Sequence, residues 1–422
     1  MQKFKFLVLI LLAFTFSLHA DKDFTPQALL SARESVKEFI VTTPLVPLPT
    51  FSKMAAKKIY LKDESCQKGL SFKTRGVTFE VFKTVEEVIS KHPEILKKGL
   101  QLVTQTDGNH GVALTLAVTS AIEKYSKQYP HLEKEIRKIE PVIFTYKNVL
   151  PLKRQTMEKA MSEYRMAAKI EAGKNTQGQI FDEYTDYGDA KKGREKFISE
   201  QEGRAIYMEH GGIKTMLGHA TASLEIIEQL KALGIRDNEK VCLMLPIGAG
   251  GPIGLAAALK TFRPGSSAVM VQTPRWGAFV RSFANGKMEV NDASLSPFTV
   301  EVMDNGALKP VIYEDGISVD APESMEAIAR ARTYLDDAVL ADPKRALKQI
   351  APVLLFDLDT FYKNPSKSIV GGTTAIVADA LLFHPTLKAI HEADVVVIFA
   401  TEGSIDPAVL RTTRALLEKR PF

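Results

Sequence analysis

Short apolar runs rich in β-branched residues alternate with longer amphipathic segments along most of this 422-residue chain. The runs that we expect to form strands are residues 58–62, 101–106, 141–146, 241–247, 268–273 and 395–401. The segments between them that we expect to form helices include residues 111–123, 215–233 and 254–262. This alternation predicts an α/β fold with mainly parallel sheets, covered by helices on both faces. Ligands in such folds bind at the carboxyl ends of the strands.

The N-terminal segment has the layout of a secretory signal peptide. Lys3 and Lys5 precede an apolar run over residues 6–16, and Ala20 provides a small residue at the expected cleavage position. We therefore predict a signal peptide at residues 1–20 and a periplasmic or secreted protein. The apolar run is shorter than the about 20 residues that cross a bilayer, so no stable membrane span is expected after cleavage. Leu18 stands where a small residue is preferred, which leaves an uncleaved tether as the alternative.

Charge and cysteine content exclude several classes of protein. The net charge is +5, and loss of Lys3 and Lys5 with the signal peptide would reduce it to +3. A weak excess without a basic run gives no indication of nucleic-acid binding. Cys66 and Cys242 are the two cysteines, too few for a disulfide framework, so stability must come from core burial. We identify no metal-binding motif.

Four strand-to-loop junctions carry candidate functional residues. The first follows the predicted strand at residues 58–62 and contains Lys73 within residues 71–76. A lysine that forms an imine must stand near the start of a helix with its amine partly desolvated. Taken alone, such a lysine is most often an exposed surface residue.

The second junction runs from a predicted strand into a helix over residues 104–111. Its short polar side chains and backbone amides suit an anion such as a substrate carboxylate, for which Thr106 and Gly108 are the candidates. The alternative is a capping turn, because Thr, Asp and Asn are all good N-caps. Asp107 beside a bound carboxylate would have a raised pKa, which suits a group that exchanges protons.

The third junction is glycine-rich and precedes the predicted helix at residues 254–262. Glycines allow backbone N–H groups to converge on phosphate oxygens, with the helix dipole adding attraction. The residues concerned are Gly248, Ala249, Gly250 and Gly251. The turn lacks the lysine of a P-loop and has no evident acidic ribose partner, which argues against a nucleotide.

The fourth junction ends the predicted strand at residues 395–401 on a hydroxyl residue, Thr401. A neutral hydroxyl beside a pyridine nitrogen would leave that nitrogen unprotonated, unlike an aspartate. By itself Thr401 marks only a strand end.

In their order and spacing, the four junctions resemble the type II family of pyridoxal-phosphate (PLP) enzymes. This family includes threonine dehydratase, bacterial D-serine dehydratase and 2,3-diaminopropionate ammonia-lyase, and the resemblance covers about residues 43–407. It implies a tryptophan synthase β-like fold with the cofactor in a cleft between a large and a small domain. It also implies that Lys73 carries PLP as a Schiff base and that Asn109 hydrogen-bonds to the cofactor's 3-oxygen. The glycine-rich turn would bind the phosphate, and Thr401 would face the pyridine nitrogen.

Two subfamilies compete within this resemblance. Residues 62–65, 106–111 and 401–403 are similar to diaminopropionate ammonia-lyase, in which the loop aspartate is regarded as the base for the D-substrate. Asp107 matches that aspartate. Other stretches look more like D-serine dehydratase, namely residues 182–188, 246–252, 315–319 and 364–366. Asn364 is a departure, because much of the family has Glu before Pro-Ser.

Both relatives remove a β-substituent from a small amino acid and release pyruvate and ammonia. The resemblance therefore implies a PLP-dependent ammonia-lyase, with Lys73 and Asp107 as catalytic residues. β-Replacement by an added nucleophile, as in cysteine synthase, stays open, and so does a non-catalytic exported PLP- or amino-acid-binding protein. A homodimer is common in the family though not universal. We expect a large domain at residues 21–83 and 201–422, with a small domain at residues 84–200 inserted into it.

Overall fold

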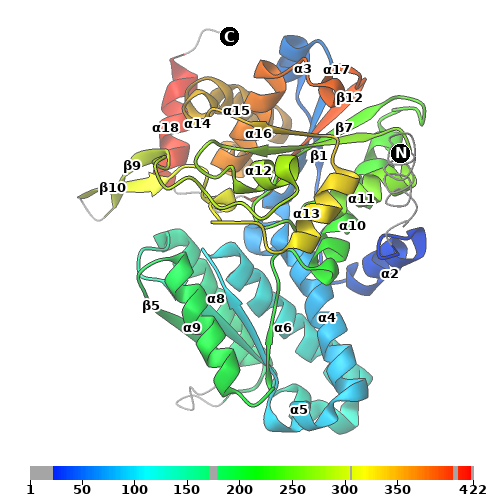
Figure 1. Cartoon of the computed structure of the whole chain (residues 1–422), viewed down its shortest axis with the longest axis vertical. Coiled ribbons are helices and arrows are strands. Elements are labelled where there is room, and N and C mark those ends of the chain that lie inside the picture. The colour runs from blue at the N-terminus through cyan, green and yellow to red at the C-terminus, as the bar shows by residue number, and fades with distance from the viewer. Residues whose placement is uncertain (1–21, 171–177, 305–306, 403–406, 420–422) are drawn as a thin grey trace, which may run out of the picture.

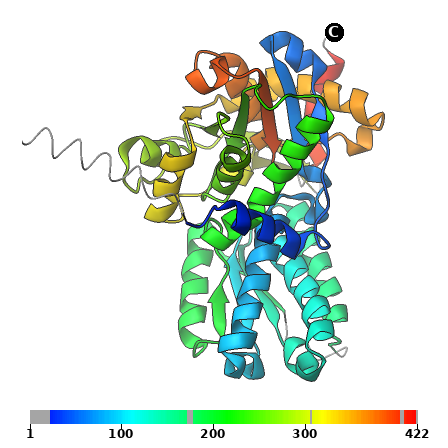
Figure 2. The ribbon, with the colours of Figure 1, turned by 90° about the vertical axis from the view of Figure 1, so that its right-hand side faces the viewer.

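The computed structural model describes residues 22–170, 178–304, 307–402 and 407–419. The predicted signal peptide therefore lies outside the described residues. The chain forms two lobes, stacked along its long axis (Figures 1 and 2). No helix in the described ranges is both long and apolar enough to cross a membrane.

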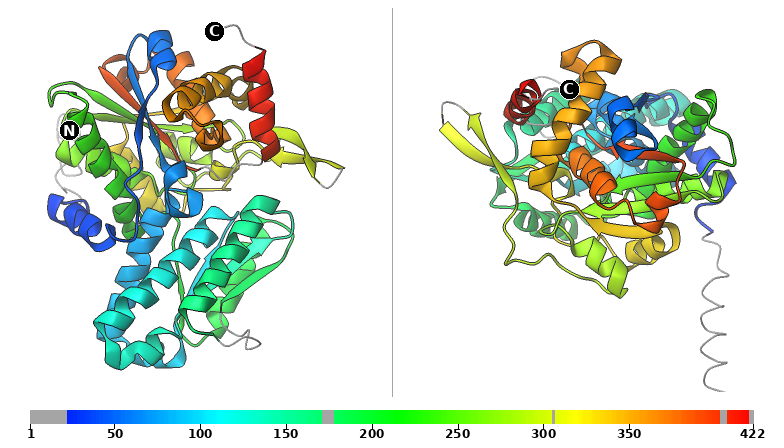
Figure 3. Two further views of the ribbon diagram at one scale, coloured as in Figure 1. Left: turned by 180° about the vertical axis from the view of Figure 1, so that it is seen from behind. Right: turned by 90° about the horizontal axis from the view of Figure 1, so that it is seen from above.

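The larger lobe is built on a six-stranded sheet in the order β1-β2-β12-β7-β8-β11. All neighbouring strands in this sheet are parallel except β1, which is antiparallel to β2. The bounds are β1 Leu45–Pro47, β2 Lys58–Asp63, β7 Val241–Pro246, β8 Ser267–Gln272, β11 Asp337–Leu340 and β12 Val395–Ala400. An antiparallel hairpin of β9 (Thr299–Asp304) and β10 (Ala307–Ile312) projects from the side of this lobe (Figure 3).

The smaller lobe is built on a second sheet in the order β5-β4-β3-β6, with all pairs parallel. Its strands are β3 Gln101–Gln105, β4 Glu140–Tyr146, β5 Gln179–Tyr184 and β6 Ala205–Tyr207. β6 joins this sheet although it lies beyond residue 200, where we expected the small domain to end. The two sheets confirm the predicted α/β fold with mainly parallel strands.

Helices cover both faces of each sheet. The helices of ten residues or more are α2 Pro26–Val36, α4 Lys73–Lys91, α6 Asn109–Gln128, α8 Pro151–Ala167, α9 Tyr187–Glu200, α10 Ile213–Ala232, α11 Ile253–Phe262, α13 Met325–Tyr334, α15 Ala351–Tyr362, α16 Gly372–Phe383 and α18 Pro407–Glu418. The shorter ones are α3 Pro49–Ala55, α5 Pro93–Lys98, α7 Glu133–Ile136, α12 Ala278–Asn285, α14 Pro343–Arg345 and α17 Lys388–His391.

Alternate side chains of the buried strands enter two separate cores of the larger lobe. Val396 and Ile398 of β12 pack with α15 and α16, whereas Val395, Val397 and Phe399 pack with α10 and α11. In the smaller lobe, α4, α6 and α8 form one core and α9 packs over the other face of the sheet. Because these strands are buried on both faces, they appear in the sequence as continuous apolar runs.

Candidate active site between the lobes

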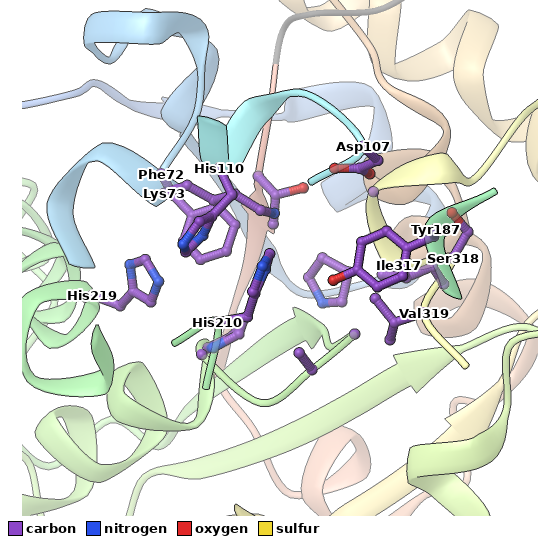
Figure 4. A pocket seen from close by; sticks show the side chains of 17 residues that line it. Phe72, Lys73, Asp107, His110, Tyr187, His210, His219, Ile317, Ser318 and Val319 are labelled. Carbon is purple, nitrogen blue, oxygen red and sulfur yellow. The ribbon is translucent and has the colours of Figure 1, made fainter. Parts of the chain in front are cut away.

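A pocket between the lobes is lined by residues from all four predicted junctions, the first of which contributes the start of α4. Of the predicted site residues, those that line it are Lys73, Asp107, Gly248, Ala249, Gly251 and Thr401. The other lining residues are Phe72, His110, Tyr187, His210, His219, Pro246, Pro252 and residues 316–319 (Figure 4). Strands β3, β7 and β12 all end at this pocket, as expected for parallel sheets.

Lys73 is the first residue of α4, and its position is fixed by the end of β12. The Phe72 amide donates to the Thr401 carbonyl at 3.0 Å, and Ser71 pairs with Glu402 in an isolated β-bridge. These backbone contacts bring the lysine beside Thr401, whose hydroxyl lies 3.2 Å from the Thr373 hydroxyl. Lys73 is half-buried, with Nζ 5.0 Å from the centre of the Phe72 ring.

A buried ion network anchors the start of α4. The Arg75 guanidinium, fully buried, bonds to Glu64 and to Glu225, in each case at 2.7 Å. Lys62 contacts the same Glu225 carboxylate at 2.6 Å. Burial alone would lower the pKa of Arg75, but the two carboxylates raise it overall. The network ties α4 to β2 and α10 and so holds Lys73 in place.

The loop between β3 and α6 is capped by a predicted site residue. The Thr106 hydroxyl accepts from the amides of Gly108, at 2.8 Å, and Gly111, at 3.3 Å. Gly108 has φ +135°, and a Cβ there would lie 2.6 Å from Cβ of Lys153. Thr106 and Gly108 therefore shape the loop, and neither is among the residues that line the pocket.

Lys153, which sequence reasoning missed, binds to Asp107. Its Nζ lies 3.7 Å from Asp107 Oδ2 and 2.6 Å from Asp315 Oδ2, and the side chain is 1% exposed. Burial alone would raise the pKa of Asp107, but Lys153, together with Lys73 and His210, lowers it below the usual value. The expectation of a raised pKa was therefore wrong, because the sequence gave no sign that a lysine 46 positions along the chain lies beside this carboxylate.

Asn109 is buried at the start of α6, and its amide donates to the Glu402 carboxylate. Burial, with a contribution from Asp315, raises the pKa of Glu402 to about 7, although Lys153 opposes the shift. Asn109 is not itself a pocket-lining residue. Asn364 lies away from the site, where its side chain caps a short turn by accepting from the Ser366 amide at 3.0 Å.

Three histidines gather beside Phe72 and Lys73 (Figure 4). The rings of His110 and His210 stack with centroids 3.8 Å apart, and His210 Nε2 lies 2.9 Å from the Gln105 carbonyl. Burial lowers the pKa of all three histidines, and Lys73 adds to the effect. They are therefore neutral at physiological pH. Nothing in the sequence around His210 or His219 indicated that they belong to the site, whereas His110 lies within the predicted loop.

The glycine-rich turn between β7 and α11 provides unpaired backbone donors. The amides of Gly248, Ala249, Gly250 and Gly251 have no acceptor among the residues that the structure describes. Gly250 has φ +131°, which favours glycine, and a Cβ on Gly251 would lie 2.9 Å from the His210 carbonyl oxygen. A phosphate at the start of a helix would satisfy these amides. The donors, the nearby lysine and the Thr401 hydroxyl fit PLP.

Comparison with known proteins agrees with this geometry. A family model described as "Pyridoxal-phosphate dependent enzyme" matches residues 36–121. The chain has the type II fold of PLP-dependent enzymes, and PLP is its cofactor.

Individual relatives are distant. The chain is 23% identical over 287 residues to a serine racemase from Dictyostelium discoideum, covering 68% of this chain and 69% of that protein. It is 24% identical over 383 residues to an L-threonine ammonia-lyase from Thermotoga maritima, covering 90% and 76%. Diaminopropionate ammonia-lyase from Escherichia coli has a similar fold, with a TM-score of 0.66 at 17% identity, covering 94% of this chain and 93% of that one.

Proposed function

We propose that this chain is a PLP-dependent ammonia-lyase that acts on a small β-substituted amino acid of the D-serine or 2,3-diaminopropionate type. The reaction would be α,β-elimination, releasing pyruvate and ammonia. The observation that carries the proposal is the presence of Lys73 and Asp107 in one pocket with the unpaired amides of the glycine-rich turn. The similarity to a threonine ammonia-lyase and the shared fold with diaminopropionate ammonia-lyase support it.

Several residues of this chain have separate roles in the proposed reaction. Bound PLP supplies a conjugated ring that stabilises negative charge at the substrate's Cα. Lys73 binds the cofactor and serves as a proton-transfer group at Cα. Asp107, held ionised by Lys153, is a second group that can take a proton. The loop at residues 106–111 lies at the start of α6, where the positive end of the helix dipole suits the substrate carboxylate.

The experiment is pyruvate release by the purified protein from D-serine, L-serine and both enantiomers of 2,3-diaminopropionate. We expect at least one substrate to give pyruvate, with one ammonia per pyruvate from serine and two from 2,3-diaminopropionate. Absence of pyruvate from all four would overturn the lyase proposal. An added thiol tests β-replacement, because a replacement enzyme would yield a thioether amino acid in place of pyruvate.

The Lys73→Ala variant should lose the visible absorbance band of the bound cofactor. Lys83→Ala, ten residues along the same helix, is the matched control and should keep the band. A protein that has the band and turns over no amino acid would be the non-catalytic binding protein.

Amino-acid racemisation is a second candidate, favoured by one observation. Lys73 and Asp107 provide two proton-handling groups in the same pocket, and one relative is a serine racemase. A racemase exchanges the Cα proton without losing the β-substituent. Incubation of D-serine or L-serine in deuterated water, followed by chiral chromatography, separates the two reactions.

Export is a further part of the proposal. Residues 1–20 would direct the protein to the periplasm or the medium, where PLP, chiefly a cytoplasmic cofactor, is scarce. Cell fractionation and the intact mass of the mature protein test this. Full-length mass in the cytoplasmic fraction would overturn it.

A further inference from the structure

His219 lies beside the glycine-rich turn but belongs to none of the four predicted junctions. It projects from α10, is 2% exposed and packs its ring against Phe72, with centroids 4.5 Å apart. A Cβ on Gly251 would lie 2.9 Å from His219 Cδ2 and 3.0 Å from Nε2. The edge of the imidazole that carries Nε2 therefore packs against Gly251 of the glycine-rich turn.

The backbone of α4 determines which ring nitrogen carries the proton. The Gly76 amide donates to His219 Nδ1 at 3.1 Å. The Phe72 carbonyl, which accepts from the Arg75 amide at 3.0 Å, is also within hydrogen-bonding reach of the ring. A neutral imidazole that accepts at Nδ1 must carry its proton on Nε2. Burial, with help from Lys73 and Arg75, lowers the pKa of His219 well below the ordinary value, so the ring stays neutral.

The pocket has few positive charges with which to bind a phosphate. Lys73 is the one cation among the described residues that line the pocket, and its amine is used to bind the cofactor. Lys153 is occupied by Asp107 and Asp315. A phosphate in this pocket is therefore held by neutral N–H groups and the α11 dipole.

We propose that His219 is a cofactor-binding residue whose Nε2–H donates a hydrogen bond to the phosphate of PLP. Because Gly76 fixes the ring, the donor is already oriented before the cofactor binds. The proposal rests on PLP as the cofactor and is independent of the reaction that the enzyme catalyses.

Two substitutions at this position separate donation from packing. His219→Leu fills the space without a donor, whereas His219→Gln places an amide N–H near the position of Nε2. Loss of a hydrogen bond to a charged group lowers affinity by roughly 10- to 100-fold. We expect His219→Leu to raise the dissociation constant of PLP by that factor, measured by equilibrium dialysis, and His219→Gln to stay within about threefold of wild type. His391→Leu, at an exposed position of α17, is the control.

Phosphorus-31 NMR of the holoenzyme gives a readout that does not depend on turnover. The phosphate resonance should move in His219→Leu and return towards the wild-type position in His219→Gln. Equal PLP affinity and an unchanged resonance in His219→Leu would overturn the proposal. Equal losses in both variants would also overturn it, because packing would then be the cause.

A tautomer measurement on the wild-type holoenzyme keeps the test valid if the leucine variant does not fold. With nitrogen-15-labelled histidine, we expect the proton of His219 on Nε2 and protected from exchange. A proton on Nδ1 would overturn the proposal.

Discussion

Lys153 of α8 and Asp315, the first residue of a short turn at Asp315–Ile317, form an ion pair between the two lobes. Nζ and Oδ2 are 2.6 Å apart. The same ammonium lies 3.7 Å from Asp107. Burial alone would lower the pKa of Lys153, but Asp107 and Asp315 raise it well above the ordinary value. One contact between the lobes and the ionisation of Asp107 thus depend on the same lysine.

Lys153→Met should therefore weaken catalysis and open the site. It leaves two carboxylates without their cation, and removing one partner of a buried pair costs several kcal/mol. We expect kcat/KM to fall about 100-fold, in line with a loss of about 3 kcal/mol. Bound PLP should react faster with hydroxylamine. Lys159→Met, on an exposed position of the same helix, should change neither rate. Wild-type values for both quantities in Lys153→Met would refute the role of this pair.

Asp107→Asn should distinguish the two proton-handling groups. We expect kcat/KM for the preferred D-substrate to fall about 100-fold, the usual scale for a lost general base, with a smaller effect on the L-substrate. Because the pKa of Asp107 is depressed, its carboxylate is ionised throughout the range from pH 5 to 9, so Asp107 should add no ascending limb to the wild-type profile there. The check is kcat/KM against pH for both enantiomers. An equal loss for both would show that Asp107 is not selective.

Arg75→Leu should destabilise the fold strongly. It leaves Glu64 and Glu225 without the Arg75 cation in a region with almost no solvent access. The free energy of unfolding should fall by about 3–5 kcal/mol. Urea unfolding of the holoenzyme measures it. Arg33→Leu, which removes an exposed pair with Glu228, is the control and should cost less than about 1 kcal/mol. Similar losses in the two variants would contradict the role assigned to the buried network.

Glu80→Gln should flatten the dependence of stability on pH. Glu80 accepts from the Glu209 amide at 3.0 Å and from the Thr215 hydroxyl at 2.8 Å, and burial raises its pKa to about 8. The folded state then keeps a proton that the unfolded chain releases above its ordinary pKa of 4.5. The contribution of Glu80 to the free energy of unfolding is therefore highest below pH 4.5. It falls as the pH rises to about 8, by up to about 1.4 kcal/mol per pH unit.

Thermal or urea unfolding of Glu80→Gln between pH 5 and 9 tests this expectation. The contribution of Glu80 should disappear, so that the variant loses less stability than wild type across this range. Exposed Glu94, replaced in the same way, should leave the wild-type slope unchanged. An unchanged slope in Glu80→Gln would show that Glu80 does not hold a proton in the folded state.

The bounds of strands with a strong sequence pattern were predicted from the sequence to within two residues at each end. β7, expected at residues 241–247, spans Val241–Pro246, and β12, expected at 395–401, spans Val395–Ala400. Strands of three or four residues, such as β1 and β6, were missed because so short a run gives no periodicity to recognise. The β9–β10 hairpin was missed as well.

Local sequence determined the strand ends, the glycine-rich turn and the lysine at a helix start, because turn chemistry and periodicity depend on neighbours along the chain. Only the tertiary structure decided the charges and tautomers within the site. Lys153 reaches Asp107 from another helix, and the Gly76 amide orients His219 from 143 positions away. Both effects arise from burial and through-space electrostatics, which follow distance in the fold and not separation in sequence.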